Sequence, residues 1–215
     1  AQGVPVVAVI TNDPGSGFDR SLVHHLLNSP EAARAAVSAI VDFCLEHGLA
    51  GINLDFENVP PQDRAALTAF VAQLGAAMRG HGLMLTMSVP AKVWDDPLHA
   101  WSGAYDYSAL AEHVDALIPM GYDEHWFGGP AGPVASLPWI EAVATFAMKA
   151  ASKTMVILAL PAYGYDWAPA LGQARAFPGR EGLALAARFG ATVAWDDRAQ
   201  VPHFTYYRNG VAHVV

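Results

Sequence analysis

Three polar side chains alternate with apolar ones in the segment GINLDFE, residues 51–57. The polar positions are Asn53, Asp55 and Glu57. Alternation at a period of two predicts a β-strand whose polar residues share one face. The Cα atoms of Asp55 and Glu57 would lie roughly 6.6 Å apart, so both carboxyls can reach one substrate. Carboxyls this close push their pKa values apart, and one that stays protonated can act as a general acid.

The sequence around this segment predicts alternating strands and helices. The expected strands are 4–10, 51–57, 83–89, 115–122 and 154–163, and the expected helices are 31–47, 60–82, 105–114 and 136–151. Short links between such units predict a parallel sheet with right-handed crossovers. We expect a (β/α)8 barrel, in which active sites lie at the C-terminal strand ends. An open doubly wound sheet is the alternative, but it usually carries a Gly-rich phosphate loop, which we do not find.

The pattern changes after Trp167. Residues 181–190 have helical spacing, and Asn209-Gly210 lies between two strand-like runs, which is a strong hairpin signal. We therefore expect a barrel core over residues 1–167 and a small α+β appendage over 168–215.

Composition excludes several classes of function. The 215 residues are 53% hydrophobic and 15% charged, as in a packed globular protein. The net charge of −8 argues against nucleic acid and anionic membranes as partners. The longest apolar run, 155–163, is about half the length of a membrane-spanning helix, and the first residues show no basic segment of a signal peptide. The single cysteine, Cys44, falls in an apolar helical pattern and is predicted to be a buried core thiol.

Several motifs in the expected order resemble one enzyme family. GINLDFE resembles the D-G-x-D-x-D-x-E signature of glycoside hydrolase family 18, which includes chitinases and related N-acetylglucosaminidases. MGYDEHW (120–126) resembles the M-x-Y-D signature of its sixth strand, LPAYGYDW (160–167) resembles its seventh-strand segment, and the hairpin-bearing tail resembles its α+β insertion. Asn53 together with YGYDW resembles two bacterial branches in particular. These are the spore-cortex-lytic N-acetylglucosaminidases and the family domain fused to polysaccharide synthases and deacetylases.

The resemblance implies a role for each matching residue. Glu57 would be the general acid that protonates the glycosidic oxygen. Asp55 would orient the N-acetyl group of the substrate, whose carbonyl oxygen attacks the anomeric carbon in place of an enzyme nucleophile. Tyr122 would hydrogen-bond this acetamido oxygen, Asn53 would support Asp55, and Asp123 would contact the sugar. The mechanism needs no cofactor.

Other polar and aromatic residues near the predicted strand ends are candidates for sugar binding. His125 is either a sugar-binding residue or an ordinary loop residue. Trp126 and Trp167 are either stacking platforms for sugar rings or core residues, and Tyr163 belongs to the seventh-strand motif. The histidines lack the spacing of a zinc site, so we expect no metal.

The resemblance implies a retaining glycosidase that acts on β-linked N-acetylglucosamine polymers, such as chitin, peptidoglycan or an exopolysaccharide. These substrates lie outside the cytoplasm, which predicts an extracytoplasmic protein of bacterial cell-wall or polysaccharide degradation. The alternative is a non-catalytic carbohydrate-binding module or an inactive domain of a larger polysaccharide-processing protein. Ala50 replaces the first acidic residue of the signature, and only the third to seventh barrel strands are recognisable. We therefore expect an incomplete barrel with two open edges, completed by flanking segments of a longer chain.

Overall fold

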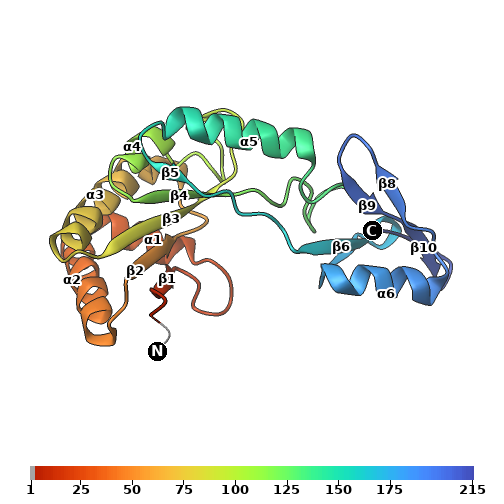
Figure 1. The fold of residues 1–215 in the computed structure, drawn as a ribbon, viewed down its shortest axis with the longest axis horizontal. Helices are drawn as coiled ribbons and strands as arrows, with labels where there is room; N and C mark the ends of the chain where they lie inside the picture. Colours follow the sequence, from red (N-terminus) through yellow and green to blue (C-terminus); the bar gives the residue numbers. More distant parts are fainter. Residues whose placement is uncertain (1–2) are drawn as a thin grey trace. The chain divides into compact units, whose positions relative to one another are not determined.

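The computed structural model describes residues 3–215. The chain forms two compact units (Figure 1). The first contains the chain up to Met120 together with Ala144–Leu158, and the second contains Gly121–Val143 and Ala159–Val215. Each unit has its own sheet and its own hydrophobic core.

The sheet of the first unit has five parallel strands in the order β1-β2-β3-β4-β5. The strands are β1 (Val7–Thr11), β2 (Gly51–Asp55), β3 (Met84–Pro90), β4 (Ala116–Met120) and β5 (Met155–Val156). Helices connect them, as the alternating pattern predicted. The α/β class is therefore confirmed, and no closed barrel forms among residues 3–215.

The first unit has its helices between the strands, and capping residues mark several of their ends. The helices are α1 (Arg20–Asn28), α2 (Pro30–His47), α3 (Arg64–Gly80), α4 (Tyr107–Ala111) and α5 (Leu137–Ala150), with a 3-10 turn, η1 (Pro61–Asp63), before α3. Ser29 caps α2, and Gly48 ends it with a φ of 60°, a conformation that favours glycine. The sequence analysis missed α1, although Asp19 is a strong signal for its start because the carboxylate accepts from the Ser21 and Leu22 N–H groups.

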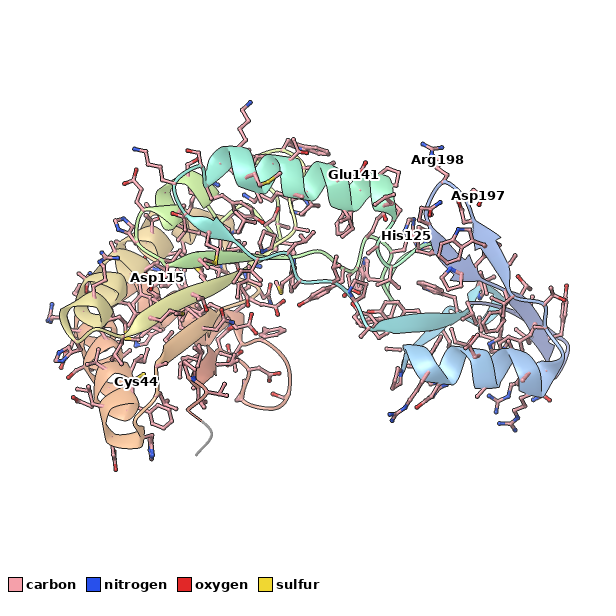
Figure 2. All side chains as sticks on the ribbon, in the orientation of Figure 1. Cys44, Asp115, His125, Glu141, Asp197 and Arg198 are labelled. Atoms are coloured by element: carbon pink, nitrogen blue, oxygen red, sulfur yellow. The ribbon has the colours of Figure 1, made fainter. Side chains whose placement is uncertain are left out.

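Alternation along the strands separates an apolar face from a polar one. Ile52 and Leu54 of β2 are fully buried in the core that α2 and α3 share with the sheet. Cys44, labelled on α2 in Figure 2, lies in the same core, which confirms the predicted buried thiol. Burial raises the pKa of this thiol. Asn53 and Asp55 occupy the intervening positions of β2 and are only partly buried.

The second unit is built on antiparallel pairing. One sheet has the order β10-β11-β6-β7, and β8 and β9 form a separate hairpin. These elements are β6 (Tyr163–Ala168), η2 (Pro169–Leu171), β7 (Gln173–Pro178), α6 (Gly179–Phe189), β8 (Ala194–Asp196), β9 (Val201–His203), β10 (Thr205–Arg208) and β11 (Val211–Val214). The predicted hairpin turn is confirmed: Asn209 and Gly210 join β10 to β11 with φ angles of 51° and 77°.

The predicted strand 154–163 is wrong in its extent. Only Met155 and Val156 pair with β4, and Tyr163 begins β6 in the other sheet. Pro161 has no N–H to donate to a ladder and separates the apolar run from β6, but the pairing with β4 already ends at Val156. The expected division into a barrel core over residues 1–167 and an α+β appendage over residues 168–215 stays a prediction.

The outer strands of the parallel sheet expose apolar side chains. Within the described chain, β1 pairs only with β2, and β5 pairs only with β4. Val9 of β1 is 59% exposed and Met155 of β5 is 64% exposed. Exposed apolar edge strands pair with other chains unless a charge discourages it.

We predict that the isolated 215-residue chain associates through β1 and that Val9→Lys weakens this association. The substitution should change the free energy of unfolding by less than ~0.5 kcal/mol because the side chain is exposed. Light scattering over a range of protein concentrations measures the effect. Leu45→Lys is the matched control, since Leu45 is 51% exposed on α2 and not on an edge strand. Equal effects of the two variants, or a chain that is monomeric without either, would contradict the prediction.

Candidate active site

A chain of hydrogen bonds links four polar side chains on two neighbouring strands, β2 and β3. The Thr86 hydroxyl donates to Oδ1 of Asn53 at 3.0 Å, and Nδ2 of Asn53 donates to the Ser88 hydroxyl oxygen at 2.8 Å. Ser88 in turn hydrogen-bonds the carboxyl of Asp55. The strand register explains the arrangement because Asn53 pairs with Thr86, and Asp55 and Ser88 are each two residues further along. Asn53 therefore supports Asp55 indirectly, through Ser88.

The carboxyl of Asp55 has one oxygen that nothing in the described chain satisfies. Its Oδ1 atom is buried and has no hydrogen-bond partner among residues 3–215. Burial raises the pKa of Asp55, and the Ser88 hydrogen bond partly opposes this shift. A buried acceptor without a partner costs about 1–3 kcal/mol, and a ligand with a suitably placed donor would offset this cost.

Glu57 lies beyond the end of its strand. The sequence predicted a strand through residue 57, but β2 ends at Asp55, and Asn58 has a φ of 55°, which turns the chain. Both backbone polar groups of Glu57 are held by the Asn12 side chain. The Glu57 N–H donates to Asn12 Oδ1 and Asn12 Nδ2 donates to the Glu57 carbonyl, each at 2.9 Å. The preceding carbonyl, that of Phe56, accepts from the Tyr105 hydroxyl at 2.7 Å.

The second unit holds a cluster of tyrosines around Asp123. Oδ1 of Asp123 accepts hydrogen bonds from the hydroxyls of Tyr163 and Tyr165. Burial and the neighbouring carboxylate raise the pKa of both tyrosines, in the case of Tyr165 to about 12, so each stays a hydrogen-bond donor. The Tyr122 ring meets the Tyr163 ring edge to face, with centroids 6.1 Å apart. Asp123 has a φ of 63°, and aspartate tolerates this conformation better than most residues.

The remaining candidates differ in exposure. His125, labelled in Figure 2, has its Nδ1 atom 2.9 Å from the Pro133 carbonyl, which holds the ring to its own loop. Trp126 is 46% exposed, so it can offer a ring face to a sugar. Trp167 is only 4% exposed, and its indole N–H donates to the Trp126 carbonyl at 3.4 Å. Trp167 therefore supports the Trp126 loop and has little surface left for a ligand.

The structure groups the predicted residues by unit. Asn53 and Asp55 form one network in the first unit, where Glu57 follows two residues later, while Tyr122, Asp123 and Tyr163 form the other cluster in the second unit. The sequence analysis missed Ser88, Asn12 and Tyr105. Ser88 had a signal, since it alternates with apolar residues in β3 as Asp55 does in β2. No group of three or more potential metal ligands occurs in the part of the chain that the structure describes, and no helix there is long and apolar enough to cross a membrane.

Comparisons with a family model, with curated proteins and with solved structures identify the family of this chain. The model of "Glycosyl hydrolases family 18" matches residues 14–214. The glycosylase YvbX of Bacillus subtilis is 37% identical over 162 residues, which cover 74% of this chain and 47% of that protein. The cortical fragment-lytic enzyme of Bacillus cereus is 28% identical over 212 residues, or 96% of this chain and 49% of that one. The crystal structure of a chitinase from Chromobacterium violaceum superimposes with a TM-score of 0.90 at 31% identity, covering 98% of this chain and 66% of that one.

The chain belongs to glycosyl hydrolase family 18. It spans about half the length of the curated relatives it matches. The resemblance inferred from the motifs is confirmed, and the sheet corresponds to part of the barrel of the family's chitinases.

We predict that Asp55→Asn stabilises the folded chain at pH 7. Below the pKa that Asp55 has in the unfolded state, the folded and unfolded states both carry its proton, and the residue does not lower the free energy of unfolding. As the pH rises through the raised pKa of the folded state, that state acquires a poorly solvated charge, at about 1.4 kcal/mol for each unit of pKa shift. Removing the charge should raise the free energy of unfolding at pH 7 and have a shrinking effect toward pH 3.

Urea unfolding at both pH values measures this difference. Asp42→Asn is the control, because Asp42 is an exposed carboxyl on α2. A less stable Asp55→Asn variant at pH 7 would show that the carboxylate is stabilised by its surroundings and would overturn the interpretation of its buried oxygen.

Proposed function

We propose that this chain carries the catalytic residues of a retaining glycosidase that cleaves β-linked N-acetylglucosamine polymers with assistance from the substrate. The single observation that carries the proposal is the buried, unpartnered Oδ1 of Asp55, two residues before a second carboxyl at Glu57. Family membership supports the proposal, and relatives named as a cortical fragment-lytic enzyme and a chitinase agree with it.

Asp55 is proposed to act on the N-acetyl group of the substrate. In the attack, the acetamido oxygen forms a bond to the anomeric carbon and the nitrogen becomes positively charged. The amide N–H of the substrate is the kind of donor that Oδ1 of Asp55 lacks. A carboxylate already in place beside this developing charge lowers the barrier without reorganisation, which is usually the largest catalytic term.

Glu57 is proposed to donate a proton to the glycosidic oxygen as the bond from that oxygen to the anomeric carbon breaks. The leaving sugar departs as an alcohol, and an oxazolinium ring remains on the other part of the substrate. Water then attacks the anomeric carbon, Glu57 takes a proton from it, and the ring reopens to restore the acetamido group. Two displacements at the same carbon retain the β configuration.

The second cluster is proposed to recognise the sugar. Tyr122 would donate a hydrogen bond to the acetamido oxygen, and Asp123 would accept one from a sugar hydroxyl. The hydroxyls of Tyr163 and Tyr165 hold the Asp123 carboxylate in place for this contact. Trp126, with nearly half of its surface exposed, is the proposed stacking platform for a sugar ring, and His125, which lies beside it in the sequence, is a further candidate for sugar binding.

The proposed substrates are chitin, peptidoglycan or a related exopolysaccharide, and all of them place the protein outside the cytoplasm. The relatives named as a cortical fragment-lytic enzyme and as a chitinase support this substrate class. The competing proposal is a module that binds such polymers without cleaving them. The presence of both Asp55 and Glu57 favours the enzyme, because binding alone needs no proton donor.

We predict that Glu57→Gln lowers kcat by at least ~10²-fold and leaves the affinity for N-acetylglucosamine oligomers nearly unchanged. The amide keeps the size of the side chain but has no transferable proton. Hydrolysis of a chromogenic N-acetylglucosaminide and calorimetric binding measure the two effects. Glu46→Gln, at an exposed position of α2, is the control and should keep full activity. Unchanged hydrolysis by Glu57→Gln would remove Glu57 from the role.

We also predict that hydrolysis requires the acetamido group. Oligomers without N-acetyl groups should not turn over, and a thiazoline mimic of the oxazolinium should inhibit competitively. Equal rates on acetylated and deacetylated oligomers would contradict the roles proposed for Asp55 and Tyr122. Binding of acetylated oligomers without any hydrolysis would support the non-catalytic module instead.

A further inference from the structure

The peptide groups on either side of Glu57 lie outside the hydrogen-bond ladder of the sheet. The pairing of β1 with β2 ends at Thr11 and Asp55, and the pairing of β2 with β3 ends at Leu54 and Met87. Residues 56–58 therefore have no neighbouring strand to hold them. Backbone of this kind moves more easily than a strand unless side chains supply the missing hydrogen bonds.

Asn12 supplies two of these hydrogen bonds. It is the first residue after β1. Its side-chain amide forms the two hydrogen bonds to Glu57 that a backbone peptide group of a neighbouring strand would otherwise form. Its Oδ1 accepts the Glu57 N–H, while its Nδ2 donates both to the Glu57 carbonyl and, at 3.2 Å, to the Asp19 carbonyl. Asn12 is only 3% exposed, so water cannot readily replace these bonds.

Tyr105 supplies the next hydrogen bond along the chain. Its side chain is fully buried, and its hydroxyl donates to the Phe56 carbonyl at 2.7 Å. Burial raises the pKa of this hydroxyl, so it remains a hydrogen-bond donor at neutral pH. Phe56 and Glu57 are thus held by side chains from two different loops of the first unit.

An ion-pair network fixes Tyr105 itself. Nζ of Lys92 donates to the Tyr105 carbonyl at 2.6 Å and to Oδ1 of Asp95 at 2.7 Å. Arg64, at the start of α3, pairs with Asp95 at 2.7 Å and with Asp106 at 2.9 Å. Lys92 is 4% exposed; burial lowers the pKa of its ammonium group, and the pairing with Asp95 partly opposes this shift. The network therefore ties the segment that carries Tyr105 to α3.

We propose that Asn12 and Tyr105 are positioning residues for the general acid, which hold the Phe56–Glu57 backbone so that the Glu57 carboxyl meets the glycosidic oxygen. The inference rests on the proposed function of Glu57. Neither residue needs to touch the substrate. A displacement of about 1 Å in a catalytic group can cost ~10²-fold in rate, so loss of either contact should lower kcat more than it changes KM.

The chain offers a matched pair of variants for Tyr105. Tyr107 is also buried, at 2% exposed, and its hydroxyl donates to a backbone carbonyl, that of Pro90 at the end of β3, instead of to the Phe56–Glu57 segment. Tyr105→Phe and Tyr107→Phe each remove one hydroxyl and one buried hydrogen bond. We expect similar decreases in Tm, but a decrease in kcat of ~10-fold or more for Tyr105→Phe only, with KM nearly unchanged. Equal effects of the two variants on kcat would overturn the role of Tyr105.

Backbone hydrogen exchange tests Asn12 without relying on activity. In the wild-type protein the Glu57 N–H should be protected, and in Asn12→Ala it should exchange as fast as exposed loop amides, while amides of β2 stay protected. Asn12→Ala should also lower kcat with little change in KM. A Glu57 amide that exchanges rapidly in the wild type, or protection unchanged in Asn12→Ala, would overturn the role of Asn12.

The two measurements separate this inference from the proposed function. A protected Glu57 amide in a protein that hydrolyses no N-acetylglucosaminide would contradict the glycosidase but leave the backbone contacts standing. Hydrolysis that depends on Glu57 but not on Asn12 or Tyr105 would support the glycosidase and contradict the positioning residues.

Discussion

The candidate site depends on one constraint: a parallel strand with helices on one side must place every second residue on its other side. In β2 this puts Ile52 and Leu54 in the core and leaves Asn53 and Asp55 on the opposite face. The neighbouring strand repeats the pattern, so Ser88 meets Asp55 at the same level of the sheet. A carboxylate in this position loses hydrogen bonds to water, and the side-chain network replaces only some of them, since Oδ1 of Asp55 has no partner in the described chain. The remaining unsatisfied oxygen is the feature that we connect with substrate binding.

The hydrogen-bond network on the strands holds the carboxyl of Asp55, whereas residues from loops hold the backbone of Glu57. Hydrogen bonds between strands set the orientation of the Asp55 carboxyl, because Asn53 and Ser88 are themselves on rigid strands. Glu57 lies beyond the strand, so its placement depends on side chains that reach it from loops. The carboxyl proposed to bind the N-acetyl group, that of Asp55, is thus held by the sheet, and the carboxyl proposed to exchange protons, that of Glu57, is held by loop residues. In this family context, changes in the loops are expected to affect turnover before they affect binding.

Local signals in the sequence predicted much of the fold. The extent of α2 was predicted as 31–47 and observed as Pro30–His47, because the glycine that ends it, Gly48, is a local signal. The hairpin at Asn209 was visible for the same reason. The extent of β5 was wrong, because a run of apolar residues does not show where pairing partners end.

The candidate site was predictable only in part. The two carboxyls and the family motifs could be read from the sequence directly, but the end of β2 at Asp55, which leaves Glu57 outside the strand, could not. The residues that hold Glu57 could not, because Asn12 lies 45 residues from Glu57 and Tyr105 lies 49 residues from Phe56. Such contacts arise from the packing of loops at one end of the sheet, and no periodic pattern in the sequence predicts them.

The stereochemistry of hydrolysis tests the central claim most directly. Proton NMR spectra recorded within the first minutes of the reaction distinguish the anomers of the newly formed reducing end before they interconvert. Substrate assistance involves two displacements at the anomeric carbon, so a β-linked oligomer of N-acetylglucosamine should give the β-anomer first, followed by slow conversion to the equilibrium mixture. Initial formation of the α-anomer would mean a single displacement by water and would contradict the proposed role of Asp55.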